Sequence, residues 1–343
     1  MTGPSPTRRL DARRLARAAG VAGVGVAALA GLAAASPTVR AEAHRLRDLG
    51  RPLDLAGGPP VPPPLPPGVT VAVPGRGEVF VRDSGMRRPA VLLLHGWGVT
   101  ADVNFFRAYP ALADHRVVAV DHRSHGRGIR AHAPFCLEDC ADDVGGLLAV
   151  LGIDRAVAVG YSMGGPIALL LARRHPELVS GLVLAATALE FSSEARDRAL
   201  WRGLTVLEAA LRHGYGDGVV QRILREAVEK EPSLDPYRAW LAGEFRRGHA
   251  PGLVEAGRAL SRFDARAFVT GLHQPAAVVL TTEDRLVPPH KQRALAAALA
   301  APVFRLEADH DAPLACGDAF GAVVRAAVGH VAGHAGHRPG ALV

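Results

Sequence analysis

The chain has 343 residues, of which 49% are hydrophobic and 21% are charged, so it can bury a sizeable core and is expected to form one main folded domain with additional segments. Its formal net charge is +7, but only 5% of its residues are aromatic, and the arginines are spread along the chain with their densest cluster at the N-terminus. Because no basic stripe is interleaved with aromatic residues, the composition argues against a nucleic-acid-binding protein.

The first 50 residues combine a basic flank with an apolar run. Arginines between Arg8 and Arg17 precede residues 18–35, which are only alanine, glycine, valine and leucine. This run is slightly long for the core of a signal peptide and just long enough for a membrane span. We expect an uncleaved N-terminal anchor that associates the protein with the membrane of the cell envelope. A cleaved export signal and a soluble helix in a cytoplasmic protein are the alternatives.

Residues 51–68 are rich in proline, which predicts a stiff polyproline linker before a domain that begins near Val69. Two strands over 69–73 and 78–82 predict an opening hairpin. The apolar run from Ala90 to Leu94 is typical of a strand buried on both faces.

That run leads into His95-Gly96-Trp97-Gly98. Open α/β sheets place their sites where parallel strands end, and glycines there allow backbone N–H groups to face a cavity. The backbone N–H of Trp97 is therefore a candidate oxyanion donor. A plain glycine turn with a packed tryptophan is the alternative.

A short helix is expected over 104–113 and a buried strand over 116–121. The loop that follows contains His122 and His125, which we interpret as structural because no carboxylate spacing supports a metal site. A helix is predicted over 137–151. Cys136 and Cys140 lie at its start, and with Cys316 they match no metal-binding spacing, so free thiols are favoured over a local disulfide between the first two.

The apolar run 156–159 ends in Gly160-Tyr161-Ser162-Met163-Gly164, which matches the G-x-S-x-G pattern of a nucleophile elbow. Ser162 is the candidate nucleophile, and the Met163 backbone N–H at the start of a helix over 163–175 is the second candidate oxyanion donor. Another strand over 182–186 continues the alternation of strand and helix, which predicts a parallel sheet.

Residues 189–271 contain no convincing strand and are too many for a plain loop. We interpret them as a helical cap over the site, with ordinary outer-face helices as the alternative. The domain core is then expected to comprise 69–188 and 272–335, followed by a tail over 336–343.

A strand over 276–282 precedes two acids. Asp284 is preferred over Glu283 as the carboxylate that orients a histidine, because it stands directly before an Arg-Leu-Val-Pro turn. After a last strand over 303–306 comes His310, the candidate base for Ser162. The final helix is expected over 314–331. His330, His334 and His337 have a spacing similar to that of metal ligands, but a solvated terminus is favoured.

The order Ser162, Asp284, His310, with His95-Gly96-Trp97-Gly98 upstream, resembles the α/β-hydrolase superfamily over residues 69–331. Gly160-Tyr161-Ser162-Met163-Gly164-Gly165-Pro166 and the loop Asp121-His122-Arg123-Ser124-His125-Gly126 are most similar to its cap-bearing esterase, lipase and cofactor-free haloperoxidase-like branch. Two positions depart from the pattern: Ser124 and Asp309 stand where these relatives commonly have glycine.

The resemblance implies an α/β fold with a mostly parallel, doubly wound sheet and a helical cap insertion. It also implies hydrolysis through an acyl-enzyme that needs no metal or cofactor. A serine at the elbow argues against epoxide or haloalkane hydrolysis, for which relatives use aspartate.

The leading hypothesis is a serine hydrolase that cleaves small carboxylic esters, with short to medium acyl chains or derived from lipids. Acyl transfer, perhydrolysis or haloperoxidase-like activity on the same three residues is the nearest alternative. A non-catalytic binding protein of the cell envelope is the alternative from another class. The sequence does not identify the substrate-binding residues or the oligomeric state.

Overall fold

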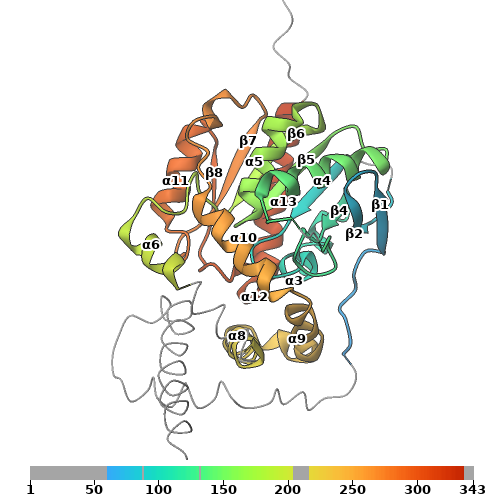
Figure 1. Ribbon diagram of the computed structural model, residues 1–343, viewed down its shortest axis with the longest axis vertical. Coiled ribbons are helices and arrows are strands. Elements are labelled where there is room, and N and C mark those ends of the chain that lie inside the picture. Colours follow the sequence, from blue (N-terminus) through green and yellow to red (C-terminus); the bar gives the residue numbers. More distant parts are fainter. Residues whose placement is uncertain (1–59, 87–88, 131–132, 204–215, 336–343) are drawn as a thin grey trace, which may run out of the picture.

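The computed structural model describes residues 60–86, 89–130, 133–203 and 216–335 (Figure 1). The expected anchor, most of the proline-rich linker and the tail with His337 lie outside the described residues. Among the helices of these ranges, none combines the length and the apolar character needed to cross a bilayer.

One sheet of eight strands organises the described part of the chain, in the order β1-β2-β4-β3-β5-β6-β7-β8. The pairs β1–β2 and β2–β4 are antiparallel and all other pairs are parallel, which confirms the predicted α/β class and mostly parallel sheet. The strands are β1 Gly68–Val73, β2 Gly77–Asp83, β3 Ala90–Leu94, β4 Arg116–Val120, β5 Ala156–Tyr161, β6 Val179–Ala185, β7 Ala276–Thr281 and β8 Val303–Leu306.

Helices cover both faces of this sheet. All five residues of β3 are buried, and they alternate between two hydrophobic cores: Leu92 and Leu94 belong to one, Val91 and Leu93 to the other. A strand covered on both faces must be apolar throughout, which is why the sequence has a continuous apolar run here. The first core is completed by α4 Leu137–Val150, α5 Gly164–Arg174 and α11 Pro289–Ala298, and the second by α3 Ala101–Phe105 and α13 Gly317–Ala335.

Two predicted helices are divided differently. The helix expected over 104–113 is replaced by α3 and a 3₁₀ turn, Pro110–Leu112. Helix α3 begins earlier than predicted because the Thr100 side chain caps it by accepting the Val103 N–H (3.2 Å). The helix does not continue through the 3₁₀ turn because Pro110 has no N–H to donate. The final helix is interrupted at Cys316, whose backbone is not helical, so α12 Ala312–Ala315 precedes α13.

Between β6 and β7 the described residues are helical, and we call residues 189–203 and 216–271 the cap. Its two ends meet where Glu190 and Asp264 form an antiparallel bridge, and the Ala265 N–H donates to the Leu189 carbonyl (2.8 Å). Figure 1 shows α8, α9 and α10 at the end of the sheet where α12 lies. The cap helices are α6 Ala195–Arg202, α8 Gly216–Lys230, α9 Arg238–Arg246 and α10 Ala250–Arg262. The cap also contains 3₁₀ turns at Pro232–Tyr237 and Val269–Gly271. Another 3₁₀ turn, Pro176–Leu178, lies outside the cap, before β6.

Candidate active site

Ser162 lies at the sharp turn between β5 and α5. Its φ is +53°, in the left-handed region that non-glycine residues rarely occupy. Glycines make room for this turn, since a Cβ on Gly160 would overlap the Gly164 carbonyl and a Cβ on Gly164 would overlap the Leu94 carbonyl. The structure thus places Ser162 on the strand-to-helix corner that the G-x-S-x-G pattern predicts.

The structure brings Ser162, His310 and Asp284 together. His310 Nε2 lies 2.9 Å from Ser162 Oγ, and its Nδ1 lies 2.9 Å from Asp284 Oδ2. Asp284 follows β7 and His310 follows β8, so neighbouring parallel strands deliver both side chains to the same edge of the sheet. With Nδ1–H donating to Asp284, Nε2 is left to accept the Ser162 proton.

Asp284, and not Glu283, faces the histidine. The Asp284 side chain is completely buried, whereas Glu283 is exposed. The Asp284 carboxylate also accepts the Thr281 hydroxyl (2.7 Å), the Val287 N–H (2.7 Å) and the Gln292 amide (3.2 Å). These contacts fix the carboxylate. Gln292 was not predicted, and nothing in its local sequence marks it.

Asp309 takes the place of the glycine that relatives have before the histidine. Its carboxylate accepts the backbone N–H of His310 (2.7 Å) and that of Arg285 (2.9 Å), which ties the histidine turn to the turn after β7. Burial acts to lower the pKa of His310, but the carboxylate of Asp284, with those of Asp309 and Asp311, outweighs burial and raises it. Asp309 therefore supports the His310 turn rather than displacing the histidine.

Trp97 and Met163 flank the serine. A Cβ on Gly96, next to Trp97, would lie 3.3 Å from Ser162 Cβ, so the loop after β3 runs directly beside the nucleophile. Within the described ranges, no protein group accepts a hydrogen bond from the backbone N–H of Trp97 or of Met163. Two donors without protein acceptors beside a serine can bind a negatively charged oxygen.

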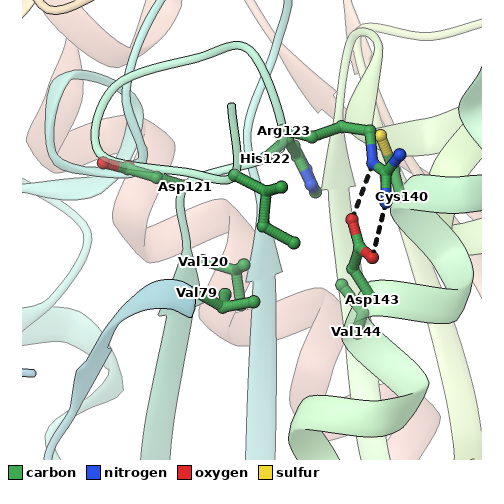
Figure 2. Close-up of a pocket in the computed structure, with 9 residues that line it drawn as sticks. Val79, Val120, Asp121, His122, Arg123, Cys140, Asp143 and Val144 are labelled. Atoms are coloured by element: carbon green, nitrogen blue, oxygen red, sulfur yellow. Dashed lines mark hydrogen bonds and ion pairs between the residues drawn. The ribbon is translucent and has the colours of Figure 1, made fainter. Parts of the chain in front are cut away.

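The loop after β4 contacts the start of α3, which follows the Trp97 loop in the chain. Asp121 accepts the backbone N–H of Ala101 (2.9 Å) and the Arg127 side chain (2.9 Å). Ser124 has a φ of +64°, in the left-handed region that glycine adopts most readily. Figure 2 shows Arg123 of this loop paired through two hydrogen bonds with Asp143 of α4.

Figure 2 also shows a cavity between this loop and α4, with His122 and Cys140 among its lining residues. Its volume of about 10 Å³ offers room for at most one water molecule, so it is too small for an organic substrate. Cys136, Cys140 and Cys316 are all free thiols.

Three buried histidines lie close together where β3 and β4 end. The His95 ring centroid lies 4.4 Å from that of His122 and 5.3 Å from that of His125. His95 is held by the His122 backbone N–H (2.9 Å), but the Nε2 atoms of His122 and His125 have no hydrogen-bond partner in the described structure. Burial lowers the pKa of all three histidines, that of His125 to about 3.

Acid is expected to destabilise the fold through these histidines. Below about pH 6.5 the unfolded chain binds protons that the folded protein cannot accept, so the free energy of unfolding falls with pH. His125, with a folded pKa of about 3, should remove about 2 kcal/mol between pH 7 and pH 5, and His95 and His122 act in the same direction. The raised pKa of His310 acts in the opposite sense: its contribution is complete below about pH 6.5 and is lost as pH rises through its folded pKa.

Urea unfolding at several pH values measures this dependence. His125→Leu should reduce the loss by about 2 kcal/mol, whereas His273→Gln, which changes an exposed imidazole, should preserve it. Equal pH dependence in all three proteins would show that the buried histidines are not responsible.

The chain belongs to the alpha/beta hydrolase fold family, whose model matches residues 89–316. It is similar to a pimeloyl-[acyl-carrier protein] methyl ester esterase of Chromobacterium violaceum, with 34% identity over 65% of this chain and 86% of the relative.

Two solved structures show the same fold. The enol-lactonase of Burkholderia xenovorans LB400 has a TM-score of 0.65 and 27% identity over 75% of this chain and 98% of its own. A bromoperoxidase of Bacillus anthracis has a TM-score of 0.63 and 16% identity over 75% of this chain and 98% of its own. The predicted resemblance to the esterase and haloperoxidase-like branch is confirmed.

Proposed function

We propose that the protein is a serine hydrolase that cleaves carboxylic esters through an acyl-enzyme. The observation that carries this proposal is the continuous hydrogen-bonded series from Ser162 Oγ through His310 to Asp284. The names of two relatives agree with it, since a methyl ester and an enol lactone both contain an acyl–oxygen bond.

In the proposed first step, Ser162 Oγ attacks the carbonyl carbon of the ester while His310 Nε2 takes the hydroxyl proton. The negative charge passes to the carbonyl oxygen, where the N–H groups of Trp97 and Met163 and the N-terminus of α5 can stabilise it. When the tetrahedral intermediate collapses, the bond to the alcohol oxygen breaks and His310 returns the proton to that oxygen. The acyl group remains on Ser162.

In the second step His310 takes a proton from water, and the resulting hydroxide attacks the acyl carbon. The bond to Ser162 Oγ breaks, the serine regains the proton and the carboxylic acid leaves. Asp284 keeps the imidazole in the required tautomer and stabilises the imidazolium in both steps. We propose short to medium acyl esters as the substrates, including esters derived from lipids.

The test is covalent labelling of the full-length protein with a fluorophosphonate, followed by peptide mass spectrometry. A single adduct on Ser162, lost in His310→Ala and blocked by p-nitrophenyl butyrate, is the expected result. A folded wild-type protein that remains unlabelled would contradict the proposal. Methyl esters and lactones of increasing chain length then define the acyl preference.

A further inference from the structure

The loop that carries the candidate oxyanion donor is attached to the cap through its tryptophan. The indole Nε1–H of Trp97 donates to the carbonyl oxygen of Leu253 in α10 (2.6 Å). The same indole meets Trp201 of α6 edge to face, with ring centroids 6.1 Å apart. Two cap helices therefore contact the side chain of the residue whose backbone N–H is the candidate oxyanion donor.

The far end of this loop is attached to a third cap helix. Thr100 Oγ1 lies 3.0 Å from Glu244 Oε2 of α9 and donates to it. The Glu244 side chain is only 2% exposed, although it is a carboxylate. It also accepts hydrogen bonds from Arg127 (3.3 Å) and Arg247 (2.8 Å).

Glu244 is part of a balanced group of buried and half-buried charges. Asp102 accepts Arg82 (2.8 Å) and Arg127 (2.9 Å), and Asp121 accepts Arg127 and the backbone N–H of Ala101. Removing one member would leave a partner unpaired at low dielectric, which is costly. The network therefore holds α9 in one position against the start of α3. Its acids are Asp102, Asp121 and Glu244, and its bases are Arg82, Arg127 and Arg247.

Between these attachments the loop contains a glycine in the left-handed region of backbone conformation. Gly98 has a φ of +80°, and its missing side chain permits peptide rotations that other residues restrict. On the core side, the Gly96 N–H donates to Asn104 Oδ1 (2.7 Å), and the Gly96 carbonyl lies 2.7 Å from His95 Nδ1. The core therefore holds the peptide of the Trp97 N–H at its Gly96 end, and the cap contact of the indole holds it at its Trp97 end.

We infer that the cap positions the oxyanion donor. Leu253 binds the Trp97 indole and Glu244 binds the Thr100 hydroxyl. Through these two contacts, the Trp97 indole and Glu244 act as positioning residues that orient the Trp97 backbone N–H toward the substrate oxygen. This inference rests on the proposed function. It assigns to the cap a role in transition-state stabilisation in addition to contact with the acyl group. An N–H group aimed wrongly binds the ground-state ester nearly as well but stabilises the developing charge less, so kcat falls while KM is preserved.

Trp97→Phe tests the inference, because it retains an aromatic ring against Trp201 but removes the indole donor. We expect kcat for p-nitrophenyl butyrate hydrolysis to be about 10- to 100-fold lower, with KM changed less than about twofold. The concentration of active sites is determined by titration with the fluorophosphonate. The inhibition constant of phenylboronic acid, which forms a tetrahedral adduct with the serine, should rise by the same factor as kcat/KM falls.

Trp201→Phe is the matched control. Its indole donates to the Phe191 carbonyl and not to the loop, so the same chemical change should leave kcat near the wild-type value. Glu244→Gln keeps the shape of the side chain but weakens the contact with Thr100, and it is expected to lower kcat and boronate affinity about tenfold. Glu226→Gln is its matched control, because it makes the same chemical change at an exposed carboxylate of α8 that pairs with Arg222 outside this network.

The inference is overturned if Trp97→Phe and Glu244→Gln both retain the wild-type kcat per site. It is also overturned if these variants raise only KM, because the indole would then contribute to binding of the acyl group and not to orientation of the N–H. A wild-type protein without Ser162-dependent turnover would remove the proposed function and this inference together. Wild-type turnover that both the Trp97→Phe and the Glu244→Gln variants match would remove the inference alone.

Discussion

Replacing Ser162 by alanine is expected to lower kcat for ester hydrolysis about a million-fold, to the small residual rate that binding and the oxyanion donors alone support. The reason is that the proposed reaction passes through a covalent bond to Ser162 Oγ, and no neighbouring group can replace it as the nucleophile within hydrogen-bonding distance of His310 Nε2 in the described structure. Initial rates with p-nitrophenyl butyrate, measured on protein purified from an esterase-deficient host, provide the comparison.

Ser261→Ala is a suitable control, because this cap hydroxyl donates to the Arg258 carbonyl of its own helix. It should retain the wild-type rate. In urea denaturation, Ser162→Ala should also retain the free energy of unfolding of the wild type to within about 1 kcal/mol, which separates lost chemistry from lost folding. Activity of Ser162→Ala above about one per cent of wild type would exclude an acyl-enzyme on this residue.

Asp284→Asn is expected to lower kcat about ten-thousand-fold, whereas Glu283→Gln should change it less than twofold. The Asp284 oxygen that accepts His310 Nδ1–H also accepts the Thr281 hydroxyl and the Gln292 amide. The other Asp284 oxygen accepts the backbone N–H groups of Leu286 and Val287, which cannot act as acceptors, so the amide oxygen of the variant is expected to take that place and its NH₂ group to face His310 Nδ1. The imidazole is then driven to the tautomer in which Nε2 carries the proton and cannot accept that of Ser162.

The pair of variants also decides between the two acids that stand together after β7. Thermal denaturation accompanies the kinetics, because Asp284 also binds the N–H groups of Leu286 and Val287. A folded Asp284→Asn protein within tenfold of the wild-type rate would show that this carboxylate does not orient the base. A Glu283→Gln protein with an equally large loss would give that role to the exposed acid.

Local sequence patterns predict the features of this protein that depend on local geometry. A strand buried on both faces has to be apolar throughout, so β3 and β5 are visible as runs of alanine, valine and leucine. The turn at Ser162 requires glycines at fixed distances, so it can be recognised within five residues.

Features that depend on distant parts of the chain are not visible in the same way. Gln292 reaches Asp284 from α11, and Glu244 reaches Thr100 across 144 positions. Neither residue has a neighbour in sequence that marks its role. The early start of α3 is predictable from Thr100 as a helix cap.

The two departures from the glycine pattern have different physical explanations. Asp309 fits in place of glycine because its carboxylate accepts the backbone N–H groups of His310 and Arg285, which stabilises the turn. Ser124 adopts the left-handed conformation itself, and Gly252 of α10 leaves room for its side chain, because a Cβ on Gly252 would crowd Ser124. The second case depends on the cap, which is remote in sequence.

The two ends of the cap lie side by side, which allows proteins of this fold to vary the cap in evolution. Because Leu189 and Ala265 meet, and β6 pairs directly with β7, the whole insertion leaves and re-enters the sheet at one point. A cap of different length or helix number could be exchanged there without changing the spacing of the strands. The exchange is nevertheless constrained: an incoming cap must present an acceptor to the Trp97 indole and a carboxylate to Thr100, so only part of this module can vary independently of the hydrolase core.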